Sequence, residues 1–306
     1  MGLFSNKYDK SGPGISKDEA RKKGMALFFD LLGRKFWSLM WLNVLYDLFF
    51  IPIMLMFPAF LLIKNNVASL SVIGVLAVIF AFIIGPATAG MMKVLRYFYI
   101  EKHSFIARDF FDGVKENFVK ASVIGFIDCF LLVSAFASLQ VYPALAATVS
   151  KAFYIPMVIT FSIFLLVMIM NFYIFLMMTA TRLSLKQLIR NSFTLSIVAM
   201  RQNLLTVAVI IAVLFLMSIL LLNVFQVFAL LIPIFPAAFL GFVTCFNCYP
   251  VIQKYVIDPY YTERGEVNPE YLTGSGEVEE EAIFEDMGGK EEVIENRPKK
   301  KGKIIK

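Results

Sequence analysis

Long apolar stretches alternate with short polar ones along most of this chain. Four such stretches run from Phe36 to Ile63, from Val67 to about Met92, from about Phe118 to Leu139 and from about Phe153 to Met178. Each is about as long as the 20-residue helix that spans the roughly 30 Å hydrocarbon core of a bilayer. The pattern therefore predicts four transmembrane helices in this part of the chain.

A fifth apolar stretch is longer than any single span needs to be. No charged residue occurs between Arg201 and Lys254. One helix of that length would measure roughly 78 Å, more than twice the bilayer core. Asn223 and Gln226 are polar residues near its middle, so we expect the stretch to fold back there as two helices. The fold class predicted is an all-α bundle of six transmembrane helices.

The distribution of Lys and Arg predicts how these helices are oriented. From the N-terminus to the C-terminus, the segments outside the apolar stretches carry 8, 1, 6, 1, 4, 0 and 9 of the 29 basic residues. Basic residues are enriched in the cytoplasmic loops of membrane proteins. The alternation predicts a multi-pass protein of the cell membrane with both termini in the cytoplasm.

Composition agrees with a membrane protein and divides the chain into three parts. Hydrophobic residues make up 59% of the chain and charged residues 17%, and the mean hydropathy is +0.73. Soluble domains contain about 45–50% apolar and about 25% charged residues. We expect residues 1–35 to form a cytoplasmic segment with an amphipathic interfacial helix that a capping box at Ser16 and Glu19 begins. Residues 36–255 are then the transmembrane domain, and residues 256–306 a charged, disordered cytoplasmic tail. The lipid bilayer is the first expected partner, and nucleic acid is not expected.

The region around the second span combines a small-residue face with an amphipathic helix. Small residues that let helices pack closely are followed by a predicted cytoplasmic helix over about 104–118, whose polar and aromatic residues form separate stripes. The helix-packing residues are Gly85, Pro86, Ala89 and Gly90. The candidate partner-docking residues are Asp109, Phe110, Phe111, Asp112, Lys115 and Glu116. The aromatic stripe either covers the bundle or docks a partner.

Two sequence blocks in this region carry a resemblance to a known family. GPATAGMMKVLR begins at Gly85 and DFFDGVKENF at Asp109, and together they resemble the YesL-like family of bacterial integral membrane proteins. The resemblance covers roughly residues 25–255, with a longer connection between the first two spans and a long charged tail as departures. It implies an association with carbohydrate uptake, because such genes often lie beside those of sugar ABC transporters in Gram-positive bacteria.

Four polar residues fall inside the predicted spans. Asp47 and Asp128 lie about 15 Å deep, Asn171 lies at a similar depth, and Asn43 lies one helical turn from Asp47. A charged Asp at that depth costs about 2.5–3.5 kcal/mol or more. We therefore expect the four side chains to form one polar cluster inside the bundle, either as a structural contact or as part of a proton or solute pathway.

No known catalytic pattern accompanies these residues. The sequence lacks a phosphate-binding loop and a zinc-binding HExxH motif, and His103 is its only histidine, so neither an enzyme, a metal site nor a cofactor is predicted. One hypothesis is a non-catalytic accessory or regulatory partner of a carbohydrate ABC importer, which rests on the resemblance and the amphipathic helix. The alternative is a self-sufficient carrier or channel, possibly a dimer, which rests on the intramembrane carboxylates.

Overall fold

The structure is a computed structural model that describes residues 24–270, and every regular element in that range is helical. Five of its helices are long and apolar enough to cross a membrane, and the bent pair of α8 with the helical stretch from Pro236 to Glu263 makes six if it is counted as one span. This confirms the predicted all-α, polytopic fold. In chain order the elements are α1 (Met25–Asp47), η2 (Leu48–Phe50), α2 (Ile51–Leu62), α3 (Asn66–Tyr99), α4 (Ile106–Thr148), η3 (Lys151–Phe153), α5 (Tyr154–Ala180), α6 (Leu185–Val198), α7 (Met200–Asn223), α8 (Phe225–Leu231), α9 (Pro236–Ile252), η4 (Gln253–Ile257) and α10 (Asp258–Glu263).

The first span consists of α1, the short turn η2 and α2. Pro52 lies in the first turn of α2, where its missing N–H group costs little, and Pro58 lies inside α2. Residues 25–35 are the first part of α1 and continue into the span without a break. The expected interfacial helix is therefore not a separate element within the described range, and its expected start at Ser16 lies outside that range.

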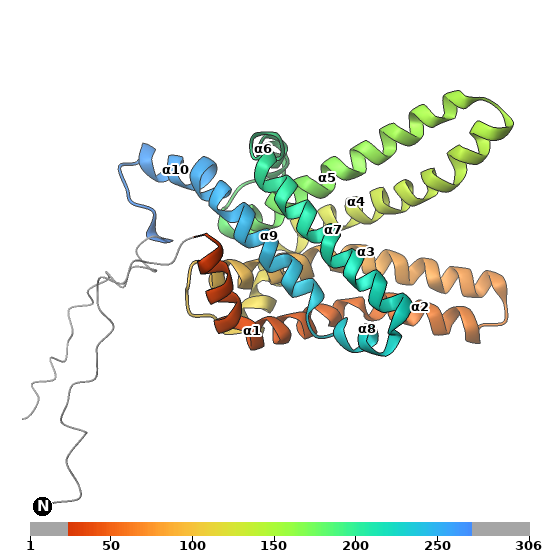
Figure 1. The fold of residues 1–306 in the computed structure, drawn as a ribbon, viewed down its shortest axis with the longest axis horizontal. Helices are drawn as coiled ribbons and strands as arrows, with labels where there is room; N and C mark the ends of the chain where they lie inside the picture. The colour runs from red at the N-terminus through yellow and green to blue at the C-terminus, as the bar shows by residue number, and fades with distance from the viewer. Residues whose placement is uncertain (1–23, 271–306) are drawn as a thin grey trace, which may run out of the picture.

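Two helical hairpins form the long arms of the molecule. Figure 1 shows the α2–α3 hairpin and the α4–α5 hairpin extending in the same general direction and separating toward their tips. Exposed apolar side chains cover these arms, and α2 has no buried residue. Such faces are suited to contact lipid.

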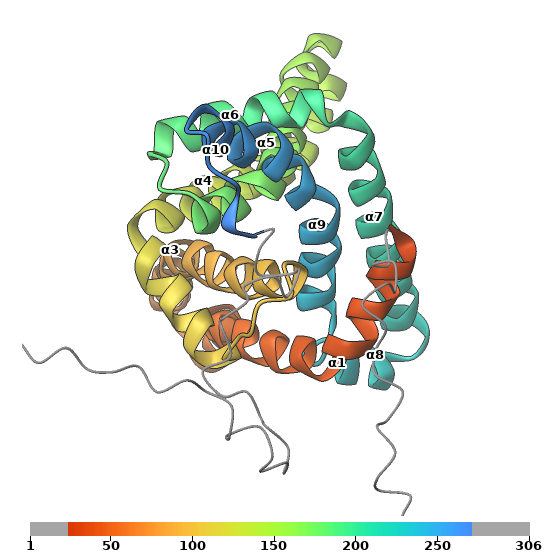
Figure 2. The same cartoon turned by 90° about the vertical axis from the view of Figure 1, so that its left-hand side faces the viewer.

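The packed core lies away from the tips of the arms. Its buried residues come mainly from the second half of α3, the second half of α5 and α9. α9 contacts α1, α3, α5 and α7 and lies in the middle of the bundle in Figure 2. We call this part the basic end, because Lys93, Arg96 and Lys102 lie where α3 leads toward α4.

The last hairpin turns where the sequence predicted, but its second arm is broken. α7 ends at Asn223 and α8 begins at Phe225. α8 is too short to span a membrane, and it meets the helix that begins at Pro236 at an angle of 59°. Pro233 and Pro236 both lack the N–H group that a continuous helix needs. The second of the two expected helices is therefore a bent pair and not one continuous helix.

Three further features differ from the expectation. The predicted helix over about 104–118 is the beginning of the 43-residue helix α4, because no helix-breaking residue separates it from the third span. The apolar pattern did not predict α6, which begins with a capping box between Ser184 and Gln187.

Residues 256–270 pack on the basic end through η4, α10 and the segment that follows, so the part of the expected tail within the described range is ordered.

Candidate functional site

A cavity of about 280 Å³ lies between α3, α4 and α5, inside the membrane region. Most of its wall is apolar, and the polar residues in the wall are Thr88, Asp128, Cys129 and Asn171. Asn171 donates a hydrogen bond from Nδ2 to Oδ1 of Asp128 over 2.8 Å, which joins α5 to α4. Two of the four residues expected to form a polar cluster therefore meet at the cavity wall.

The amide of Asn171 is only half satisfied. Its Oδ1 atom is buried and has no hydrogen-bond partner among residues 24–270. A buried acceptor without a partner costs about 1–3 kcal/mol. The cavity wall thus contains the carboxyl group of Asp128, and the residue bonded to it keeps a buried amide oxygen without a partner among residues 24–270.

The other two expected residues lie elsewhere in the bundle. Asn43 donates from Nδ2 to Oδ2 of Asp47 over 2.7 Å, one turn along α1. No hydrogen bond within the described range joins this pair to Asp128 or Asn171. α1 instead reaches the cavity wall through Tyr46, whose hydroxyl lies 3.1 Å from Oγ1 of Thr88. The expected single cluster is therefore two separate pairs, because α1 turns Asn43 toward the break between α8 and α9.

Asn43 connects α1 to both sides of that break. Its Oδ1 accepts from the backbone N–H of Ala238 over 2.9 Å, and its Nδ2 also lies 3.3 Å from the carbonyl oxygen of Ile232. The first N–H groups and the last C=O groups of a helix have no partner within that helix. At membrane depth such groups must be satisfied by the protein. Asn43, which is fully buried, meets this need for α8 and α9 together.

The small-residue face of α3 lies against α4. A Cβ atom on Gly85 would stand 1.9 Å from the carbonyl oxygen of Ala121, and one on Gly113 would stand 2.9 Å from Cα of Gly90. Pro86 and Ala89 are buried as well, and α3 continues through Pro86 without interruption. These contacts hold the beginning of α4 directly on α3.

The candidate docking residues divide into a group that makes contacts with the rest of the protein and an outward-facing group. Phe110 is fully buried in the bundle, and Asp109 accepts hydrogen bonds from Ser104 Oγ and Phe105 N at the start of α4. Glu116 accepts from the buried Lys93 Nζ over 2.7 Å, and its own side chain is 62% exposed.

Phe111, Asp112 and Lys115 form the outward-facing group. The Phe111 ring is 40% exposed, Asp112 lies 3.8 Å from Arg108 in an exposed pair, and Lys115 is exposed. The surface available to a partner at this end of α4 is therefore Phe111, Asp112 and Lys115, with the exposed Glu116 beside them held by Lys93.

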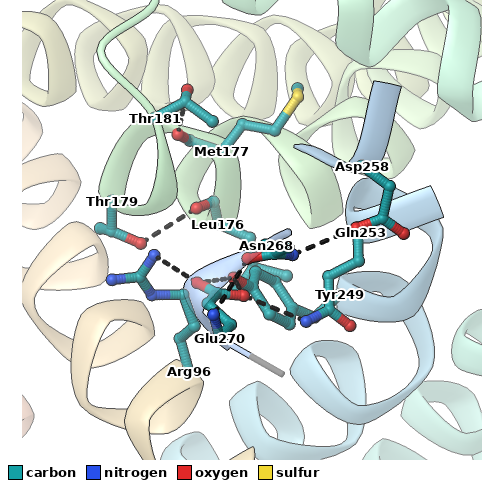
Figure 3. A network of polar contacts seen from close by, with 10 residues as sticks. All are labelled: Arg96, Leu176, Met177, Thr179, Thr181, Tyr249, Gln253, Asp258, Asn268 and Glu270. Atoms are coloured by element: carbon teal, nitrogen blue, oxygen red, sulfur yellow. Dashed lines mark hydrogen bonds and ion pairs between the residues drawn. The ribbon is translucent and has the colours of Figure 1, made fainter. Parts of the chain in front are cut away.

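A buried polar network at the basic end was not predicted from the sequence. Figure 3 shows Arg96, Tyr249 and Gln253 pointing toward the carboxylate of Glu270. Tyr249 donates to both carboxylate oxygens over 2.7 and 2.6 Å, Gln253 Nε2 donates over 3.0 Å, and Arg96 lies 3.4 Å away. Residue 270 is 174 positions from residue 96. Only the isolated polar Gln253 at the end of an apolar stretch hinted at such a contact.

Comparison with known families gives one match. The family described as "Protein of unknown function, DUF624", which is the YesL-like membrane family, matches residues 39–141, about a third of the chain. The matched segment contains the small-residue face of α3 and the beginning of α4, which carry the resemblance noted in the sequence. No curated protein and no solved structure matches the chain.

Proposed function

We propose that this multi-pass membrane protein is a non-catalytic accessory or regulatory partner of a carbohydrate ABC importer. Its basic end would face the cytoplasm, as the distribution of Lys and Arg predicts. The observation that carries the proposal is the surface of Phe111, Asp112 and Lys115 on a helix that is fixed to α3 by glycine contacts. The YesL-like resemblance supports an importer as the partner.

The properties of this surface define what it can bind. An exposed ion pair adds only about 0–1 kcal/mol to an interaction, so the Phe111 ring has to supply much of the binding free energy, as aromatic residues at interface centres do. Phe110 takes no part because it is buried. Asp112 and Lys115 then set the orientation of a partner surface with complementary charges.

Co-purification from native membranes tests this proposal. We expect the double variant Phe111→Ala, Asp112→Lys to lose the importer subunits that the wild-type protein retains, without loss of expression or insertion. Asp109 is left unchanged because it caps α4. Phe29→Ala is the matched control, because this ring is 62% exposed on α1. If the double variant retains every partner, the surface does not dock an importer.

The cavity favours a second candidate function, a carrier that moves protons or a solute. The observation behind it is the carboxylate of Asp128 in the wall of a cavity beside a buried, unpartnered amide oxygen. If the protein conducts protons, liposomes that contain it should acidify under a pH gradient, and Asp128→Asn should abolish this flux. If Asp128 is a structural contact, flux should be absent and Asp128→Asn should leave the protein folded.

A further inference from the structure

The network around Glu270 has the composition of a carboxylate-binding site. Its three ligand-facing groups are a phenol, a primary amide and a guanidinium, and all of them donate hydrogen bonds to Glu270. Tyr249 is fully buried, Gln253 is 7% exposed, and the Arg96 side chain is 11% exposed. Donors that are buried and directed at one point strongly favour an anion there, because each would otherwise lack a partner.

The donors and the acceptor come from different kinds of structure. Arg96 lies on α3 and Tyr249 on α9, and Gln253 lies one turn after Tyr249 as the first residue of η4, so core helices hold the donors in place. Glu270 lies at the end of residues 264–270, the segment that follows α10, which we call the strap; residues 264–268 form a turn and an irregular stretch, and residues 269 and 270 are helical. The acceptor therefore belongs to a segment outside the core helices that carry the donors.

The strap has its own fixed points. Gly265 adopts a positive φ of +68°, a conformation that favours glycine, and turns the chain back toward the bundle. Asn268 is 4% exposed, donates from Nδ2 to Asp258 Oδ1 over 3.1 Å, and accepts from the N–H of Glu270 over 3.0 Å. These contacts hold the strap to α10 and place the Glu270 side chain in the site.

Two observations indicate that the site is more than a structural ion pair. Arg96 Nε is buried and has no hydrogen-bond partner within residues 24–270, so the site has a donor that Glu270 does not use. Immediately after α9, the chain forms a π-helix over Gln253–Ile257. Short π-helical segments are rare and often occur at functional sites.

We propose that Arg96, Tyr249 and Gln253 form a binding site for the carboxylate of an acidic peptide segment, which Glu270 fills from within the same chain. An acidic segment of another protein binds by taking the place of the strap. The chemistry that it must supply is a Glu side chain. This inference does not depend on the proposed role beside an importer.

Peptide binding to the full-length protein in lipid nanodiscs tests the proposal. The probe is a fluorescent, C-terminally amidated peptide with the sequence of residues 264–270, RGEVNPE, and the control peptide carries Gln in the last position. We expect the Glu peptide to bind Glu270→Gln at least tenfold more tightly than it binds the wild-type protein, in which the strap competes. We expect the Gln peptide to bind Glu270→Gln at least tenfold more weakly than the Glu peptide does.

Two further variants complete the test. Adding Arg96→Gln to Glu270→Gln removes the cation and should abolish binding of the Glu peptide. Asn268→Ala loosens the strap but leaves all three donors in place, so it should also bind the Glu peptide more tightly than wild type does. It serves as the main variant if Glu270→Gln does not fold. Two results would overturn the proposal. One is equal affinity of Glu270→Gln for the Glu peptide and the Gln peptide. The other is equal affinity of Asn268→Ala and the wild-type protein for the Glu peptide.

Discussion

Gly85 on α3 and Ala121 on α4 lie so close together that a Cβ atom on Gly85 would stand 1.9 Å from the carbonyl oxygen of Ala121. Gly125 approaches the same point, and a Cβ atom on it would stand 2.7 Å from the backbone nitrogen of Gly85. The two helices are therefore in backbone contact, as small residues allow in membrane proteins. The beginning of α4 takes its position from this contact.

We predict that Gly85→Ala destabilises the protein. The added methyl group would meet backbone atoms that cannot move aside without separating the helices, and overpacking of this kind typically costs about 1–3 kcal/mol. Gly74→Ala on the same helix is the control, because a Cβ atom there meets nothing within 4 Å. Melting temperatures in one detergent should fall for Gly85→Ala and should not fall for Gly74→Ala, where Ala favours the helix more than Gly does. A similar melting temperature for both variants would contradict the close packing of α3 on α4.

A second prediction concerns Asn43. Asn43→Ala removes the partners of the Ala238 N–H group and the Ile232 carbonyl oxygen, and each unsatisfied buried group costs about 1–3 kcal/mol. We expect a loss of stability in the upper part of that range. Asn223→Ala should have little effect, because Asn223 is exposed and bonds only to the carbonyl of Ile219 in its own helix. SDS titration of both variants measures the difference, and equal unfolding free energies would argue against Asn43 as the cap of α9.

The contact between Asp128 and Asn171 can be measured with a double-mutant cycle. Asp128→Ala and Asn171→Ala each remove the same hydrogen bond, so the double variant should lose less stability than the two single variants together. Hydrogen bonds between transmembrane helices have measured coupling energies of about 0.6 kcal/mol, with a maximum of about 1.7 kcal/mol, and we expect a value in that range. Strictly additive losses would show that the pair does not couple α4 to α5.

Cysteine labelling tests the predicted orientation. Lys64 is exposed in the connection between α2 and α3, and Lys115 is exposed near the beginning of α4. In a background without Cys129, Cys245 and Cys248, a membrane-impermeant maleimide should label Lys64→Cys in intact cells and Lys115→Cys only after permeabilisation. The cysteine is placed at position 64 and not at the neighbouring Asn65, because the side chain of Asn65 caps α3. The reverse labelling pattern would invert the topology.

The sequence predicted the spans well because the physical signal for them is local. An apolar run of sufficient length has to form a helix in a bilayer, and the turn after Asn223 follows from the length of one uncharged stretch. The small-residue face of α3 was recognisable for the same reason. Its partner was not, because nothing in a single sequence shows that Gly85 meets Ala121.

Contacts between distant segments were predicted less well. Equal depth in the membrane indicated one polar cluster, but depth does not fix the direction in which a helix presents a side chain, and α1 directs Asn43 toward Ile232 and Ala238. The ordering of residues 256–270 was missed because their composition is polar. It depends on Glu270 meeting donors on α3 and α9, which only the folded chain brings together.

The position of Asn43 also bears on the order in which the chain is built. The helix that carries it is made first, whereas the backbone groups that it binds lie 189 and 195 residues further along. Until that last hairpin is inserted, the amide has only Asp47, in its own helix, as its partner. A chain that ends before this hairpin would leave Asn43 without its two backbone partners inside the membrane.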